Sequence, residues 1–280
     1  MSVRIVTDST SDIPPHLAQQ FGISIVPLSV IFGEDAYKEN VEISPDLFYD
    51  KLQKAKDLPT TSAPSVGDFL NTYREVLKET DEIISIHIAS KLSATYSNAC
   101  QAAAQLADEG ARIDVIDSQV VSLGMLFMAR RASKAAAQGA TVDEIRRLVD
   151  GMIPRMHIYV LLDTLEYVRR GGRIGRARAF IGTIMRVKPI LSIRDGEVHP
   201  EERVRTRAHA LDRMFQTATS YPKIEEIGVA YSTNAEEAEA MRLRLAEALN
   251  MSVEVTRLGP VIGVHGGPGV LGIGILEGEH

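Results

Sequence analysis

The 280-residue sequence has a single cysteine, Cys100, and no long hydrophobic run. One cysteine excludes an internal disulfide, and free thiols are typical of proteins in a reducing compartment. The longest apolar stretch, residues 23–32, is interrupted by Ser29 and falls far short of the ~20 residues of a membrane span. Residues 2–6 lead directly into a strand pattern, without the apolar segment and cleavage site of a secretory signal. These absences predict a cytoplasmic protein with no transmembrane segment.

Basic charge and the common catalytic motifs are also scarce. The formal net charge is −6, whereas binding to a nucleic-acid backbone draws on clustered lysines and arginines. No G-x-x-x-x-G-K-[ST], H-E-x-x-H or G-x-S-x-G pattern occurs, so the sequence lacks the usual signatures of a phosphate-binding loop, a zinc protease and a nucleophile elbow. Residues 267–272 fit G-x-G-x-x-G, but only eight residues follow, too few for a dinucleotide-binding unit. We therefore expect no cofactor, no metal and no nucleic-acid partner.

Alternating strand and helix patterns indicate a parallel α/β domain over residues 1–155. Helices are expected to begin after Ser44, Ser65 and Thr141, because each is a good N-cap followed by a proline or by an acidic residue at the capping-box position. The predicted strands of this domain are residues 4–7, 23–28, 83–88 and 113–116.

The pattern changes near residues 153–154, and residues 156–280 are typical of a mixed α/β domain. Asp195-Gly196 separates two strand patterns and readily adopts the positive φ angles of a tight hairpin turn, so antiparallel pairing is expected there. A strand, a helix over residues 235–249 and a further strand follow, and residues 271–276 form the last strand. The predicted fold class is therefore α/β with two domains.

Three short segments rich in hydroxyls and glycine stand out at residues 59–65, 92–96 and 265–269. If they converge in the fold, their hydroxyls, free backbone N–H groups and one imidazole form a receptor for a carboxylate or phosphate. Ser93 is the strongest candidate because it follows a strand and precedes a helix, where the helix dipole favours an anion. His265 is expected on a tight glycine-rich loop.

Thr61 and Ser62 are further candidates because they lie just before Ala63-Pro64, where the proline keeps the preceding chain extended. The alternative interpretation is structural, because serine and threonine most often serve in turns and helix caps. The same alternative applies to His265, which could stabilise a loop rather than bind a ligand. The residues alone leave both interpretations open.

The same residues are compatible with a serine esterase or a lipase-like hydrolase. Ser93 and His265 would then act as nucleophile and general base, with Asp8 or Asp117 as the acid. No nucleophile-elbow motif supports this interpretation. A carboxylate product would nevertheless bind a Ser–His site, so the hydrolase is the alternative to a binding protein.

These segments occur in a characteristic order together with residues 7–12, 117–118 and 170–174. In this order they resemble the DegV family along almost the whole chain. The resemblance implies a two-domain α/β protein that holds one long-chain fatty acid between its domains and is not itself an enzyme. It further implies that a separate ATP-dependent subunit of a bacterial fatty acid kinase converts the bound acid to acyl phosphate, a step of phospholipid metabolism.

The resemblance also implies roles for individual residues. The family positions that contact the fatty-acid carboxylate are occupied here by Thr61, Ser62, Ser93 and His265. Arg173 matches the position that engages the kinase subunit. It is one of five arginines within residues 169–178, which form either a solvated basic face or a docking surface for an anionic partner or phosphate. The family usually has glycine where this chain has Ala94. Transient membrane contact is compatible with this function, and no residue pattern identifies the lining of the tail pocket.

Overall fold

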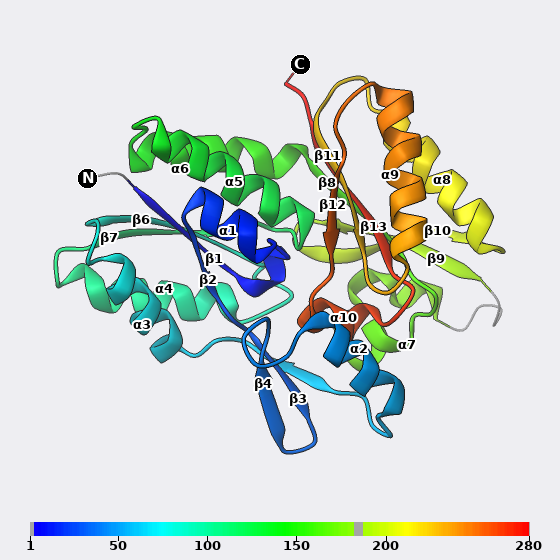
Figure 1. The fold of residues 1–280 in the computed structure, drawn as a ribbon, viewed down its shortest axis with the longest axis horizontal. Helices are drawn as coiled ribbons and strands as arrows, with labels where there is room; N and C mark the ends of the chain where they lie inside the picture. Colours follow the sequence, from blue (N-terminus) through cyan, green and yellow to red (C-terminus); the bar gives the residue numbers. More distant parts are fainter. Residues whose placement is uncertain (1–2, 182–186, 280) are drawn as a thin grey trace.

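The computed structural model describes residues 3–181 and 187–279, and within these residues the chain forms three β-sheets (Figure 1). The strands of the first sheet are β1 (Arg4–Asp8), β2 (Ile23–Val26), β6 (Glu82–His87) and β7 (Arg112–Asp117). They lie in the order β2-β1-β6-β7, and all neighbouring pairs are parallel. The parallel α/β architecture predicted for the N-terminal half is therefore confirmed.

Helices cover both faces of the parallel sheet. They are α1 (Pro15–Phe21), α3 (Val66–Val76), α4 (Thr95–Ala107), α5 (Leu123–Ala137) and α6 (Val142–Met152). α3 and α4 pack on one face, where Phe69 and Tyr73 are fully buried, and the other three helices cover the opposite face. Side chains alternate along β6, so Ile83 points to the first face and Ile84 to the second.

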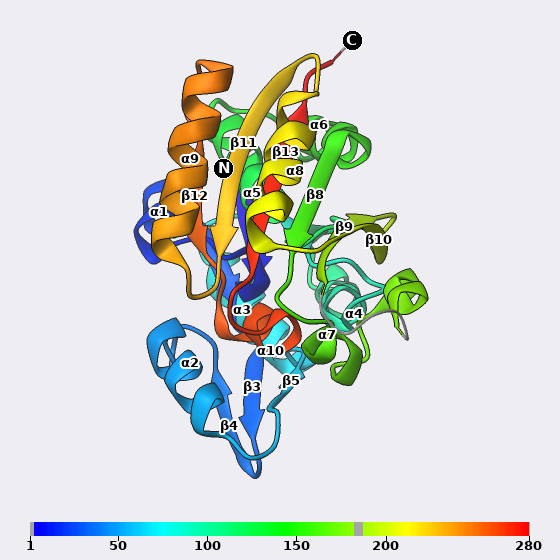
Figure 2. The same cartoon turned by 90° about the vertical axis from the view of Figure 1, so that its right-hand side faces the viewer.

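The second large sheet is mixed. Its strands are β8 (Met156–Leu161), β9 (Lys188–Arg194), β10 (Glu197–Val204), β11 (Ile224–Tyr231), β12 (Glu254–Arg257) and β13 (Leu271–Glu277). They lie in the order β10-β9-β8-β13-β11-β12, in which β11 and β12 pair in parallel and the other neighbours are antiparallel (Figure 2). The helices α8 (Arg207–Thr219) and α9 (Ala235–Leu249) cover one face of this sheet. The mixed architecture predicted for the C-terminal half is confirmed.

The third sheet is small and was not predicted from the sequence. Its strands are β3 (Ser29–Phe32), β4 (Asp35–Lys38) and β5 (Thr60–Ser62), in the order β4-β3-β5. The helix α2 (Pro45–Lys54) begins after the predicted cap Ser44 and packs beside this sheet. The helix α10 (Pro260–Gly266) packs there too, although it comes from the opposite end of the chain (Figure 2). Residues from both halves of the sequence therefore share one hydrophobic cluster.

Local sequence signals account for several turns and helix starts. Ser65 and Asp68 form the reciprocal hydrogen bonds of a capping box at the start of α3, and Thr141 and Glu144 do so at the start of α6. Asp195-Gly196 makes the tight turn between β9 and β10, with φ angles of 50° and 74°. The remaining short elements are α7 (Glu166–Arg170) and the 3-10 helices Ser9–Ser11, Ile153–Arg155 and Gly175–Phe180. Among the residues that the structure describes, no helix is long and apolar enough to cross a membrane.

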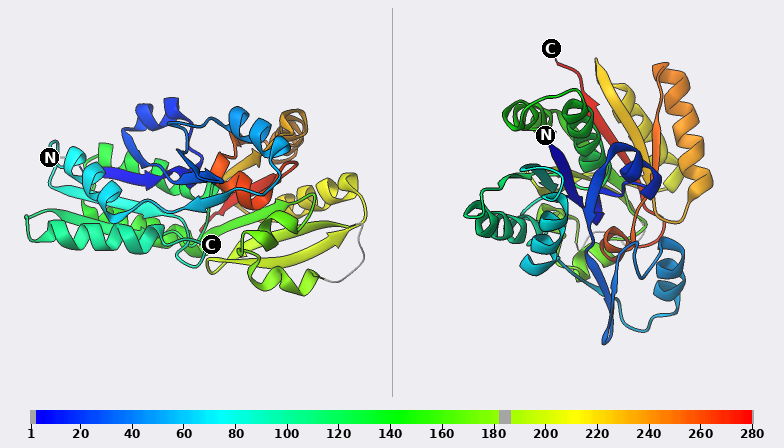
Figure 3. Two further views of the ribbon diagram at one scale, coloured as in Figure 1. Left: turned by 90° about the horizontal axis from the view of Figure 1, so that it is seen from below. Right: turned by 60° about the vertical axis from the view of Figure 1, so that its left-hand side comes forward.

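The helix α5 lies between the two large sheets and packs on both of them. Two glycines allow the close approach on the side of the mixed sheet. A Cβ at Gly274 would lie 2.7 Å from the Leu123 Cβ, and a Cβ at Gly228 would lie 2.8 Å from the Leu123 Cδ2. Figure 3 shows the strands of the parallel sheet and those of the mixed sheet on opposite sides of the molecule. The division into domains at residues 1–155 and 156–280 stays a prediction.

The packing of α5 predicts the effect of filling the space at Gly274. Gly274→Val should destabilise the protein, because overpacking of this kind costs about 1–3 kcal/mol. Gly151→Ala is the matched control, since a Cβ at Gly151 meets no atom within 4 Å and alanine favours the helix. Urea unfolding measures the free energy of unfolding of both variants. Equal stability of Gly274→Val and the wild type would contradict the packing described here.

Candidate functional site

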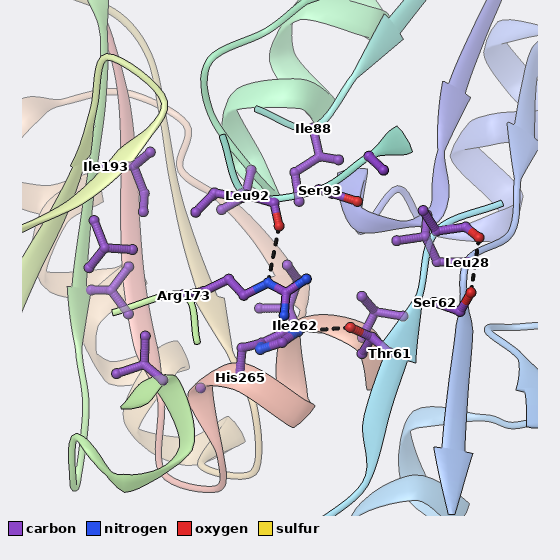
Figure 4. Close-up of a pocket in the computed structure, with 18 of the residues that line it drawn as sticks. Leu28, Thr61, Ser62, Ile88, Leu92, Ser93, Arg173, Ile193, Ile262 and His265 are labelled. Atoms are coloured by element: carbon purple, nitrogen blue, oxygen red, sulfur yellow. Dashed lines mark hydrogen bonds between the residues drawn. The ribbon is translucent and has the colours of Figure 1, made fainter. Parts of the chain in front are cut away.

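A cavity of about 470 Å³ lies where the loops after the parallel strands meet β8, β9 and α10 (Figure 4). Its size is typical of a site for a small molecule. Most of its walls are apolar. The apolar lining consists of Leu28, Ile88, Leu92, Val121, Val160, Leu162, Val168, Leu191, Ile193, Val198, Val261 and Ile262.

The residues that the sequence singles out as anion contacts all line this one cavity. They are Thr61, Ser62, Ser93 and His265, and they come from β5, from the loop before α4 and from α10. The Thr61 Oγ1 and the His265 Nε2 are hydrogen-bonded at 2.9 Å. The structure therefore brings the three predicted segments together, although contact with a ligand stays a prediction.

Thr61 and Ser62 stand on the edge of the small sheet that faces α10. Thr61 pairs with Val30 of β3, and the segment is extended, as the following Pro64 predicts. The Ser62 hydroxyl donates to the Ala63 carbonyl at 3.2 Å. Strand pairing thus fixes the backbone at Thr61, and its hydroxyl is directed at the imidazole of His265.

Ser93 lies in the loop between β6 and α4, immediately before the helix N-cap Ala94. Its Oγ accepts a hydrogen bond from the Thr95 N–H at 3.3 Å and lies 2.8 Å from the Thr95 hydroxyl. The predicted position beside a helix N-terminus is confirmed. Ala94 has a φ of −73°, so this loop does not use the positive φ that favours glycine, and the alanine is accommodated without strain.

The prediction that His265 lies on a loop is wrong. His265 is in the last turn of α10, which begins at Pro260 and is ended by Gly267 with a φ of 78°. A proline in the first turn and a glycine after the last turn are the usual limits of a helix. Val261 and Val264 bury the apolar side of α10 against the small sheet, a contact that the glycine-rich sequence does not indicate.

Two buried carboxyl groups from the N-terminal half hold the first turn of α10. The Asp12 Oδ1 accepts from the Gly259 N–H at 2.8 Å, and the Glu39 Oε1 accepts from the Val261 N–H at 2.7 Å. Burial, reinforced by the charge of Glu39, raises the pKa of Asp12 well above its ordinary value, and burial raises the pKa of Glu39 to about 7. These bonds fix one end of α10 and so position His265 at the other.

The imidazole of His265 is neutral at pH 7. Burial, and to a smaller extent the positive charge of Arg173, lowers the pKa of His265 to about 4. The ring lies so close to Gly171 that a Cβ there would be 2.2 Å from the His265 Nδ1. Within the described residues this Nδ1 has no hydrogen-bond partner. A neutral imidazole that carries its proton on Nε2 donates to the Thr61 Oγ1 and leaves the Thr61 hydroxyl free to donate to a carboxylate without ion pairing.

Arg173 follows a tight turn in which Gly172 has a φ of 72°, as the pair of glycines predicts. Its Nε donates to the Leu92 carbonyl at 3.2 Å, and its Nη1 donates to the Gly171 carbonyl at 2.6 Å. Figure 4 shows the guanidinium between His265 and the loop that carries Leu92. Arg173 is exposed, yet it also lines the cavity. Its role in partner docking stays a prediction.

The structure does not assemble the catalytic triad of the hydrolase alternative. Over residues 3–181 and 187–279, Ser93 and His265 share no hydrogen bond, because the His265 Nε2 is paired with Thr61 and the Ser93 Oγ is bonded within its own loop. Asp8 and Asp117 use their carboxylates to accept from backbone N–H groups at the ends of the strands. Neither acid is bonded to the imidazole of His265.

A different Ser–His–Asp arrangement lies in the core of the parallel sheet. The His87 Nδ1 is 2.9 Å from the Asp8 Oδ2, and the His87 Nε2 is 2.7 Å from the Ser85 Oγ, which is 2.9 Å from the Tyr73 hydroxyl. All four residues are completely buried, so no substrate can reach them. We interpret this series of hydrogen bonds as structural. It satisfies buried polar groups and holds the Asp8 carboxylate where it accepts a hydrogen bond from the Ile88 N–H.

Sequence reasoning missed the apolar lining of the cavity. Val160, Leu191 and Ile193 lie on one face of the mixed sheet, and the same alternation would be found in an ordinary core. It also missed Asn98 of α4, whose side chain donates to the Pro64 carbonyl at 2.8 Å and ties α4 to the end of β5. No local pattern distinguishes a strand face that lines a cavity from one that is packed.

The fold and the cavity define an α/β ligand-binding protein in which apolar walls meet a cluster of hydroxyls and a neutral imidazole. Among the described residues, no group of three or more His, Cys, Asp or Glu side chains is arranged to hold a metal ion.

Known sequences identify the family. The DegV family model matches residues 2–278. Protein DegV of Bacillus subtilis is 35% identical over 280 residues, which cover 98% of each chain. A DegV domain-containing protein of Halalkalibacterium halodurans is 37% identical over 281 residues, which cover 97% of each chain. The chain therefore belongs to the DegV family.

Solved structures share the fold over nearly their whole length. One is a DegV family protein from Thermus thermophilus that is described for its fatty acid binding. It has a TM-score of 0.90 and 34% identity, and the match covers 99% of this chain and 100% of the Thermus thermophilus chain. Bacillus subtilis DegV, described as a fatty acid binding protein, has a TM-score of 0.89 and 33% identity with the same coverage. A stearic acid-binding protein from Eubacterium ventriosum has a TM-score of 0.91 at 26% identity and covers 98% of each chain.

The buried imidazole predicts a stability change in acid. The pKa of His265 in the folded ligand-free protein, about 4, lies below its ordinary value of 6.5, so its contribution to stability is complete above pH 6.5 and is lost as the pH falls through 4. In the wild type the free energy of unfolding should therefore fall as the pH decreases from 6.5 through 4. His265→Gln removes this titration, so the fall should be smaller in the variant by on the order of 2 kcal/mol. Urea unfolding across this pH range measures it. His16→Gln, at an exposed position, is the control, and identical profiles for all three proteins would contradict the assignment.

Proposed function

We propose that this protein binds a long-chain fatty acid between the parallel and the mixed sheet. The observation that carries the proposal is one cavity whose apolar walls meet Thr61, Ser62, Ser93 and His265. The relatives from Thermus thermophilus and Bacillus subtilis, described as binding fatty acids, support it, as does the stearic acid-binding protein from Eubacterium ventriosum. The carboxylate lies against the polar residues, and the acyl tail runs along the apolar walls.

Burial of the acyl tail supplies most of the affinity. Each buried methylene contributes ~0.8 kcal/mol, so a tail of roughly 14 methylenes contributes on the order of 11 kcal/mol before the costs of ordering. Each hydrogen bond to the charged carboxylate adds only ~1.5–3 kcal/mol. The main task of the polar residues is therefore to orient the carboxylate.

The protein presents this carboxylate to a separate ATP-dependent kinase and is not itself the catalyst. A carboxylate oxygen attacks the γ-phosphorus of ATP, the bond from this phosphorus to ADP breaks, and acyl phosphate forms. The absence of a phosphate-binding-loop motif from the sequence supports a partner as the nucleotide-binding subunit. Arg173, on its exposed turn beside the site, engages that partner.

The proposal extends to location and partners. A cytoplasmic protein fits a chain with one cysteine, and a ligand drawn from membrane lipids requires only transient contact with a membrane. The net charge of −6 gives no support to a nucleic-acid partner. Residues 1–155 and 156–280 would act as two domains that enclose the ligand.

Lipid content tests the binding function. Wild-type protein, made without detergent in a host that is not its source, should carry one fatty acid per chain by denaturing extraction and mass spectrometry. Ser93→Ala should keep most of this lipid, because it removes a single hydrogen bond. Leu191→Trp should lose it, because the larger side chain fills the cavity, and thermal melts show whether both variants are folded. A lipid-free wild type, or one that turns over esters, would contradict the proposal.

Arg173→Ala tests the partner function. Lipid content and thermal stability should stay nearly unchanged, while phosphorylation of the bound acid by the partner kinase should fall by about tenfold or more. Wild-type binding to the partner should weaken as salt rises, because exposed charges are screened. Arg176→Ala is the matched control, since Arg176 is exposed on the same segment and pairs with Glu197 outside the cavity. Loss of lipid from Arg173→Ala, with the partner interaction intact, would assign Arg173 to the fatty-acid site alone.

A further inference from the structure

Four buried oxygen atoms near the start of α10 have no hydrogen-bond partner among the residues that the structure describes. They are the Asp12 Oδ2, the Glu39 Oε2, the Tyr49 hydroxyl and the Ser122 Oγ, and we call them the oxygen cluster. Each of these residues is only 1–5% exposed, so bulk solvent does not reach the four oxygens. None of the four residues lines the cavity of Figure 4. Because buried polar groups are nearly always bonded, the oxygen cluster points to a ligand.

Three of the four residues meet at one face of α10. A Cβ at Gly259 would lie within 3.2 Å of both the Asp12 Oδ1 and the Glu39 Oε1. A Cβ at Gly263 would lie 2.7 Å from the Tyr49 hydroxyl. Residues four positions apart lie one above the other on a helix. The two glycines therefore let both carboxyl groups and the phenol approach the same side of α10.

Ser122 brings the fourth oxygen from the start of α5. Its N–H donates to the Thr10 carbonyl at 2.9 Å, which holds it beside the segment that carries Asp12. Burial and the charge of Glu39 raise the pKa of Asp12, whereas the nearby Ser122 hydroxyl lowers it. Ser122 has a φ of 52° and a ψ of −122°, a conformation that residues other than glycine rarely adopt. The fold thus tolerates backbone strain at the residue that supplies this hydroxyl.

The oxygen cluster contains two acidic groups and, among its four residues, no basic one. Neither Asp12 nor Glu39 forms an ion pair in the described part of the chain. Arg257 lies beside Tyr49, with its Cζ 5.9 Å from the ring centroid, but its Nη1 donates to Asp46 at 2.6 Å. Buried carboxylates need either protons or a cation to balance their charge.

Protons alone leave the bonding of the oxygen cluster incomplete. A proton on Asp12 or Glu39 removes a charge but changes no distance. The hydroxyls of Ser122 and Tyr49 would still have no partner within residues 3–181 and 187–279. A cation, in contrast, coordinates carboxylate and hydroxyl oxygens at the same time and neutralises both acids.

We propose that the oxygen cluster binds a hard divalent cation, Ca²⁺ or Mg²⁺. All four ligands are oxygens, which these cations prefer, and two carboxylates balance a charge of +2, with water in the remaining coordination positions. Asp12 and Glu39 each use one oxygen for the cation and the other for an N–H group at the start of α10. The cation thereby fastens α10 to the N-terminal half of the chain.

The ligands come from separate segments of the chain, so no sequence motif indicates the site. The inference goes beyond the proposed function and does not depend on it, because the oxygen cluster lies outside the cavity of Figure 4.

Metal titration of the full-length protein tests the site. Protein treated with EDTA and dialysed is titrated with CaCl₂ and with MgCl₂ by calorimetry, and thermal melts are recorded with each salt. We expect one cation per chain and a melting temperature that rises with its concentration. Asp12→Asn should weaken binding about tenfold or more, because it removes a negatively charged ligand. Asp50→Asn is the matched control, since it removes an exposed acid next to Tyr49, and it should bind the cation as the wild type does.

Ser122→Gly keeps the site testable if Asp12→Asn does not fold. Glycine adopts the backbone angles of Ser122 without strain, so this variant should fold. Because it lacks the hydroxyl ligand, it should bind the cation more weakly by about threefold or more. A hydroxyl with only a structural role would change the melting temperature equally with and without the cation.

Terbium luminescence provides a second readout. Tb³⁺ is a hard cation that replaces Ca²⁺ at oxygen sites and emits light when a nearby tyrosine is excited. The chain has no tryptophan, so tyrosine is the sensitiser. Emission should appear with the wild type, fall when the bound cation is added and be lost in Tyr49→Phe. Tyr96→Phe, on α4, is the control and should keep the emission.

Two results would overturn the inference. One is a wild type that binds neither Ca²⁺ nor Mg²⁺. The other is equal affinity for the cation in the wild type, Asp12→Asn and Ser122→Gly. Either result would show that the oxygen cluster meets only protons or water.

Discussion

The site depends on how α10 is anchored to the N-terminal half of the chain. Asp12 and Glu39 accept hydrogen bonds from the first turn of this helix, and Val261 is buried in the cluster beneath the small sheet. At the other end of the helix His265 meets Thr61. Because two turns of helix act as a rigid rod, holding one end sets the position of the other. A cavity wall therefore forms that neither half of the chain supplies alone.

The anchor of α10 has a cost in stability, because it buries two carboxyl groups. Burial raises the pKa of Glu39 to about 7 and that of Asp12 well above its ordinary value, so the protein favours the protonated forms of both groups. Within the described part of the chain, one oxygen of each carboxyl has no hydrogen-bond partner. Apolar residues at these positions would avoid that cost but would leave the N–H groups of Gly259 and Val261 unbonded.

Signals confined to a few neighbouring residues were readable from the sequence. The capping boxes at Ser65 and Thr141 and the turn at Asp195-Gly196 depend on backbone geometry and on hydrogen bonds over three residues or fewer, so their local sequences specify them. Ser93 was placed correctly for the same reason, because its position between a strand and a helix is local. His265 was misplaced, because the glycines that follow it end a helix whose formation depends on burial against distant strands.

The sequence by itself determined the order and type of the main elements, because hydrophobic periodicity, caps and turns are properties of adjacent residues. Only the tertiary structure decided which strand faces line a cavity, that Arg173 borders it, and that β3 and β5 form a sheet beneath α10. The contact between Thr61 and His265 joins residues 204 positions apart. Contacts of this kind are set by how the packed sheets and helices fit in three dimensions, and no pattern of neighbouring side chains records that fit.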